Sequence, residues 1–126
     1  MRAIDTNVLV RLITRDDPRQ VAAAELFIRE GAWISTLALA ETVWVLETVY
    51  ELSPRRQIDA IDMLLNHREL VLQDAESVTS ALELFRAKPA LGFSDCLMLQ
   101  IARKAGYLPL GTFDRGLARI AGTQKL

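Results

Sequence analysis

Four carboxylates stand at places in the chain where acids can do chemistry together. Asp5 and Asp114 each follow a short apolar strand, whereas Glu41 and Asp95 each lie early in an apolar helix. Carboxylates that are brought together raise one another's pKa, so they remain ionised only if a positive group joins them. A hard divalent cation with oxygen ligands meets this need, and Mg²⁺ or Mn²⁺ is the candidate.

The reaction favoured by such a site is hydrolysis of a phosphodiester bond. One or two divalent ions would polarise a phosphoryl oxygen, lower the pKa of a bound water and stabilise the departing oxygen. Asn7, Ser94 and Thr112 are polar neighbours that could orient ligands or the water. The helix N-termini at Ser94 and Asp114 could help to hold phosphate.

Each acid also has an ordinary structural interpretation. Asp5 could be a helix N-cap, Asp95 a first-turn acid that the helix dipole favours, Asp114 a turn or cap residue and Glu41 a solvated helix position. The functional interpretation depends on the coincidence of all four at one end of the predicted sheet.

The elements that must position these acids follow from short apolar runs that alternate with helical patterns. Strands are predicted at 2–4, 32–34, 70–72 and 107–110, with a short fifth strand at 124–126. Helices are predicted over 6–14, 18–30, 37–52, 54–66, 75–88 and 96–105, followed by a short final helix that contains Leu117 and Ile120. Residues 89–93 are predicted to form a loop. Strands separated by helices indicate a mostly parallel sheet with helices on both faces, and its carboxyl edge is where ligands bind.

Composition indicates a single globular domain. The chain has 126 residues, of which 51% are hydrophobic and 25% charged, and a formal charge of −1 argues against binding nucleic acid through a large basic footprint. Cys96 is the only cysteine, which excludes an intramolecular disulfide and a cysteine-built zinc site. With no evident signal peptide and no long apolar run, a cytoplasmic protein without a membrane span is expected.

These motifs together resemble a known family. Asp5-Thr6-Asn7, Ala40-Glu41 after Ser35-Thr36, Phe93-Ser94-Asp95-Cys96-Leu97 and Thr112-Phe113-Asp114 are similar, in order, to the PIN-domain nucleases, especially the VapC-like toxins of bacterial toxin–antitoxin pairs. The resemblance covers essentially the whole chain, 1–126. It implies a PIN-like three-layer α/β/α sandwich with a central, mostly parallel sheet of four or five short strands.

The resemblance also implies an activity and partners. It implies an endoribonuclease dependent on Mg²⁺ or Mn²⁺, held in check by a cognate antitoxin. It makes Asp5, Glu41, Asp95 and Asp114 the catalytic and metal-site acids, with Asn7 and Thr112 in support. A homodimer built through helices near the N-terminus is a further expectation. The alternative is a catalytically silent PIN-like module that binds RNA or another protein.

Rival enzyme classes fit less well. Haloacid-dehalogenase-like phosphatases need a second Asp two residues after the first, where this chain has Asn7. A receiver domain needs an acceptor Asp directly after the third strand, and a phosphate-binding loop of the GxxxxGK type is absent. His67, the only histidine, is interpreted as a surface loop residue, and Cys96 as a buried small hydrophobic residue.

Basic residues could line an RNA path beside the acids. Most of them are expected to be solvated helix positions: Arg11, Arg15, Arg55, Arg56, Lys88, Arg103, Lys104, Arg115 and Arg119. The apolar surface around Trp44 and Tyr50 is explained equally well by core burial and by a docked partner.

Overall fold

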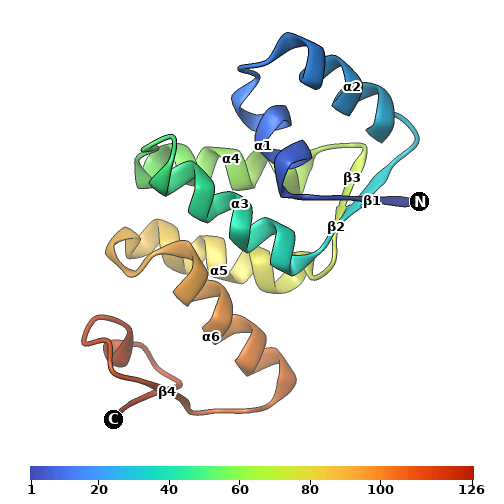
Figure 1. Ribbon diagram of the computed structural model, residues 1–126. Coiled ribbons are helices and arrows are strands. Elements are labelled where there is room, and N and C mark those ends of the chain that lie inside the picture. Colours follow the sequence, from blue (N-terminus) through green and yellow to red (C-terminus); the bar gives the residue numbers. More distant parts are fainter. The chain divides into compact units, whose positions relative to one another are not determined.

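The computed structural model describes residues 1–126 and divides the chain into two compact units, residues 1–75 and 76–126. Each unit is an α/β arrangement whose strands all pair in parallel, which confirms the predicted class. The five short strands belong to two sheets, however, and not to one central sheet: β1-β2-β3 in the first unit and β4-β5 in the second. Figure 1 follows the chain through both units.

The first unit is built around its three-stranded sheet. Its elements are β1 (Arg2–Ile4), α1 (Thr6–Thr14), α2 (Pro18–Ile28), β2 (Ala32–Ile34), α3 (Thr36–Thr48), α4 (Pro54–Asn66) and β3 (Leu70–Leu72). Strand β2 lies in the middle, with Ile4 opposite Ile34 and Ile34 opposite Leu72. All three side chains are buried. The strands therefore end in register at one edge.

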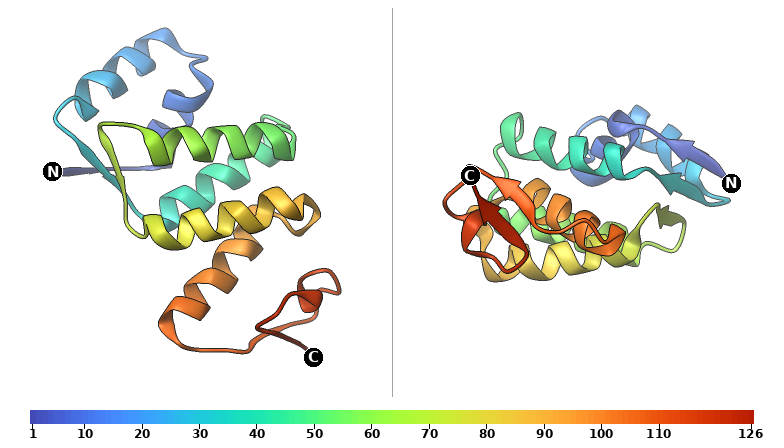
Figure 2. Two further views of the ribbon diagram at one scale, coloured as in Figure 1. Left: turned by 180° about the vertical axis from the view of Figure 1, so that it is seen from behind. Right: turned by 90° about the horizontal axis from the view of Figure 1, so that it is seen from below.

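Each helix of this unit begins at a side-chain N-cap. Asp5, Asp17, Ser35 and Ser53 each accept a hydrogen bond from a backbone N–H in the first turn that follows. Helices α1 and α3 pack together, and α3 and α4 form the predicted helical hairpin, seen in Figure 2.

Helix α3 ends earlier than its apolar pattern predicts, at Thr48 instead of residue 52. Glu51 adopts a left-handed conformation with φ of 53°, and the Leu52 N–H donates to the Leu46 carbonyl at 3.0 Å. A left-handed residue stops an α-helix by turning the chain back on the last carbonyls. The apolar residues that follow pack in that turn and do not extend the helix.

The second unit contains α6, the helix that carries Asp95. Its elements are α5 (Ala75–Ala87, entering from the first unit), the 3₁₀ turn η1 (Pro89–Leu91), α6 (Phe93–Ala105), β4 (Leu110–Thr112), the 3₁₀ turn η2 (Leu117–Arg119) and β5 (Thr123–Lys125). Phe85 and Phe93 are buried and meet edge to face, with ring centroids 6.0 Å apart. This contact ties α5 to the start of α6.

Three predicted boundaries in the second unit shift. The predicted loop at 89–93 is a 3₁₀ turn that leads directly into α6, so the helix begins at Phe93 rather than residue 96. The fourth strand runs over 110–112, since Pro109 has no N–H to donate and the pairing begins with Leu110 N–H on the Gly122 carbonyl. The fifth strand runs over 123–125, and the final helix is only a 3₁₀ turn.

No helix in the structure combines the length and apolar character needed to cross a membrane.

Candidate metal centre and nucleic-acid site

The carboxyl edge of the first sheet brings three polar residues into register. Asp5 follows Ile4 of β1, Ser35 follows Ile34 of β2 and Gln73 follows Leu72 of β3. Gln73 was not predicted to matter, but its side-chain carbonyl accepts from the Thr36 N–H at 2.9 Å and its N–H donates to the Ile34 carbonyl at 2.9 Å. It therefore fastens the start of α3 to the end of β3.

Asp5 is both a cap and an exposed carboxylate. Its Oδ1 accepts from the Val8 N–H at 3.1 Å, which satisfies one free donor at the start of α1. The cap uses one carboxylate oxygen. Because the side chain is exposed, the other carboxylate oxygen can still accept hydrogen bonds or bind a ligand from solvent. Asn7, two residues on, is also exposed, and no protein group hydrogen-bonds to its side chain. The structural and functional interpretations of Asp5 are thus compatible.

Glu41 lies in the second turn of α3, on an otherwise apolar stretch. Thr42 and Val43 beside it are buried, whereas Glu41 is exposed and has no ion pair or hydrogen bond in the structure. Trp44, one turn further along the same face, is 58% exposed. Since α3 starts at the carboxyl end of β2, Glu41 belongs to the same end of the first unit as Asp5.

In the second unit, Asp95 and Asp114 are electrostatically coupled. Burial raises the pKa of the half-buried Asp95 carboxyl, and the neighbouring charge of Asp114 raises it further. Asp95 sits in the first turn of α6, and Ser94 beside it is half-buried. A cation bound beside Asp95 would offset the neighbouring negative charge of Asp114 and favour the ionised form of Asp95.

Asp114 is held in place by its own loop. The Thr112 hydroxyl accepts from the Asp114 N–H at 3.0 Å, and Asp114 Oδ1 accepts from the Leu117 N–H at 2.8 Å. A Cβ on Gly116 would lie 3.2 Å from that same oxygen, which is tighter than an ordinary contact. The loop thus fixes the carboxylate, and Thr112 positions the backbone rather than offering a free oxygen.

The donor set fits a hard divalent cation. All four predicted acids, and the amide of Asn7, present oxygen atoms, which Mg²⁺ and Mn²⁺ prefer over nitrogen or sulfur. Asp5 and Glu41 belong to the first unit, and Asp95 and Asp114 belong to the second. The structure gathers no group of three or more carboxylate, imidazole or thiol side chains that could hold one ion.

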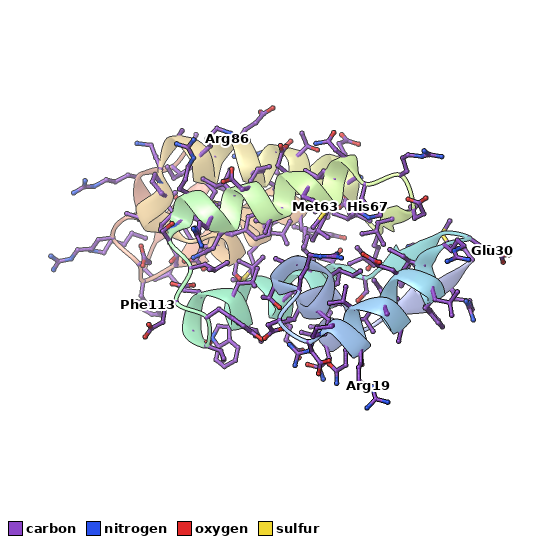
Figure 3. All side chains as sticks on the ribbon, turned by 90° about the horizontal axis from the view of Figure 1, so that it is seen from above. Arg19, Glu30, Met63, His67, Arg86 and Phe113 are labelled. Atoms are coloured by element: carbon purple, nitrogen blue, oxygen red, sulfur yellow. The ribbon has the colours of Figure 1, made fainter.

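Two other reactive side chains lie outside this chemistry. His67 comes just before β3, at the edge of the sheet opposite the carboxyl ends, and its Nδ1 accepts from the Glu69 N–H at 3.1 Å. Figure 3 shows it beside Met63 at the end of α4. Cys96 is fully buried, and burial, with the charge of Asp95, raises the pKa of its thiol to about 11. It is therefore protonated near neutral pH and is no nucleophile.

Some of the predicted basic residues form ion pairs or hydrogen bonds with other protein groups, and others do not. Arg11 pairs with Asp16 at 3.1 Å, Arg15 with Glu25 at 2.7 Å and Lys104 with Glu76 at 3.6 Å, while the Arg103 guanidinium donates to the Ala121 carbonyl. The exposed cations without such partners are Arg55, Arg56, Lys88, Arg115 and Arg119.

Comparison with known proteins gives one family match over nearly the whole chain. The family model described as PIN domain matches residues 3–123. Among solved structures, the chain is similar to that of the Mycobacterium tuberculosis toxin VapC20, described as cleaving the sarcin–ricin loop, with 18% identity, 98% coverage of both chains and a TM-score of 0.43. None of the curated proteins matches significantly. At this identity and TM-score, the likeness to VapC20 does not bear on the activity of this chain.

Proposed function

Since the chain belongs to the PIN domain family, we propose that it is a metal-dependent endoribonuclease and the toxin of a toxin–antitoxin pair. The observation that carries the proposal is the acid set: all four acids of the family pattern are present, and Asp95 and Asp114 lie close enough to perturb ionisation. We also propose that both units act as one domain, because one family model spans them.

The proposed residue roles follow from exposure and from the bonds already made. Asp5, Glu41, Asp95 and Asp114 would hold Mg²⁺ or Mn²⁺, with Asn7 and Ser94 as supporting polar groups and Thr112 as the anchor of Asp114. When bound, the cation would polarise the phosphodiester and lower the pKa of the attacking water. The unpaired cations Arg115 and Arg119, near Asp114 in sequence, are suited to RNA phosphates.

The proposed partners are supported by apolar side chains that the fold leaves exposed. These are Leu37 and Trp44 on α3 and Val49 directly after it, between 58% and 75% exposed, and Met98 on α6, 53% exposed. Exposure of large apolar side chains to water is unfavourable, and exposed apolar patches are typical of protein interfaces. We propose that a cognate antitoxin and a second copy of the chain cover part of it, in the cytoplasm.

Cleavage of RNA by purified protein tests the activity. RNA should be cut with Mg²⁺ or Mn²⁺ and left intact with EDTA. Glu41→Gln should abolish cutting, whereas the matched control Glu47→Gln, which alters another exposed acid on α3, should not. Equal activity of the two variants would contradict the role of Glu41, and EDTA-resistant cutting would contradict the metal dependence.

A further inference from the structure

A hollow between α1 and α2 adjoins the proposed catalytic edge. It has a volume of about 410 Å³, which falls in the range of small-ligand sites. Asp5 and Asn7 line it at the end of β1, and Phe27, Val8 and two alanines of α2, Ala23 and Ala24, supply apolar walls. The proposed function leaves this hollow without a role.

Two of the polar groups that line the hollow are side-chain amides with free hydrogen-bonding capacity. Asn7 lies on α1 and Gln20 on α2, and Arg11 of α1 lines the hollow as well. The Gln20 carbonyl oxygen accepts from Arg11 Nε, which orients the side chain and leaves the Gln20 amino group without a protein partner. The Asn7 side chain also lacks one. Amide groups of this kind pair with the edges of nucleobases.

The apolar side of the hollow contains the aromatic ring of Phe27, which Arg2 holds in place. The Arg2 guanidinium lies 3.8 Å from the centroid of the Phe27 ring and donates to the Phe27 carbonyl at 3.1 Å. Both contacts hold Phe27 in place. Aromatic and apolar walls with a few amides suit a flat, neutral heterocycle, because every base has a face that packs on such surfaces.

The charge balance disfavours a phosphate in the same place. The only cation in the lining is Arg11. Its guanidinium already donates to Asp16 at 3.1 Å and to the Tyr50 hydroxyl at 3.0 Å. The Asp5 carboxylate would repel an anion. The hollow is therefore suited to a neutral base, and the charged RNA backbone would lie at the divalent cation that the acids are proposed to hold.

We propose that the hollow between α1 and α2 binds one nucleobase of the RNA, next to the bond that is cut, and so sets sequence preference. This proposal rests on the proposed function, because the hollow and the catalytic edge share Asp5. It assigns Gln20 and Phe27 to substrate recognition rather than to chemistry.

Filling the hollow tests the proposal. Ala23→Leu places a larger side chain in the lining, while Ala22→Leu makes the same change at an exposed neighbouring position of α2 that does not line it. Sequencing the ends cut from a randomised single-stranded RNA should show about a tenfold or greater preference at one position for the wild type. Ala22→Leu should keep that preference, and Ala23→Leu should lose it while still cutting with Mn²⁺.

A wild type that cuts without preference, or an Ala23→Leu variant that keeps it, would overturn the proposal while the proposed function stands. If no RNA is cut at all, the function fails and a second measurement decides on the hollow. Nucleosides titrated into metal-free protein should shift the Asn7 and Gln20 side-chain amide resonances, and Ala23→Leu should remove the effect. Resonances that do not shift would refute base binding. This outcome is also the one expected if a protein side chain fills the hollow.

Discussion

At the scale of single residues, Asp95 shows how the proposed site conflicts with stability. Its pKa in the folded chain is raised by burial and by Asp114. Between the unfolded and folded pKa values, the folded state binds more protons, so stability falls as pH rises through this window and stays reduced above it. Below the ordinary pKa of an Asp, both states are protonated and the effect vanishes.

Replacing Asp95 should therefore stabilise the metal-free chain. Asp95→Asn should raise the melting temperature at about pH 7 and leave it nearly unchanged at about pH 3. Asp59→Asn, at an exposed position of α4, controls for the loss of a negative charge. Saturating Mn²⁺ should stabilise the wild type more than Asp95→Asn. An Asp95→Asn variant less stable than the wild type at pH 7 without metal would contradict the destabilising effect assigned to the Asp95 carboxylate.

Asp5 should separate activity from folding. Asn is as good an N-cap as Asp, so Asp5→Asn keeps the bond to the Val8 N–H and the melting temperature should change little. Loss of a carboxylate from the proposed metal site should lower RNA cleavage by about a hundredfold or more. Full activity in a well-folded Asp5→Asn would show that Asp5 is only a cap.

At the scale of elements, α3 has one buried side and one exposed side that its sequence does not distinguish. Apolar residues occur around its whole circumference, yet Leu46 is fully buried and Leu37 is 75% exposed. Leu46→Ala should cost about 3 kcal/mol of unfolding free energy because it leaves a cavity. Leu37→Ala should stay within about 0.5 kcal/mol.

Urea denaturation measures both α3 variants. Equal destabilisation would mean that Leu37 is covered in solution, as it would be in a stable dimer. Repeating the measurement at several protein concentrations distinguishes that case, because only an associating protein gains stability with concentration.

Element boundaries were predictable where a local signal sets them. The predicted starts at residues 18 and 54 match α2 and α4, where Asp17 and Ser53 cap the helix and Pro follows, and the predicted end of α6 at residue 105 matches a Gly106 with φ of 86°. The end of α3 was predicted wrongly because the left-handed residue after it is Glu51. A glycine at that position would have indicated the left-handed conformation, whereas a glutamate does not. The fourth strand was misplaced since an apolar run does not show which N–H groups find partners.

At the scale of the whole molecule, the parallel pairing of the strands was predictable, but their division into two sheets was not. Order along the chain indicated that strand ends meet at one edge, and the first unit confirms this for β1 and β2. Periodicity does not reveal that the five strands belong to two sheets. The support from Gln73 and the hollow beside Asp5 also went unpredicted, because both depend on contacts between residues distant in sequence.

Calorimetric titration with Mn²⁺ tests the central proposal, that Asp5, Glu41, Asp95 and Asp114 bind a divalent cation. The account predicts saturable binding by the wild type, lost in Asp5→Asn and in Asp95→Asn, and kept in Glu47→Gln. A wild type that binds no Mn²⁺, or an Asp5→Asn or Asp95→Asn variant that binds it with wild-type affinity and stoichiometry, would contradict it.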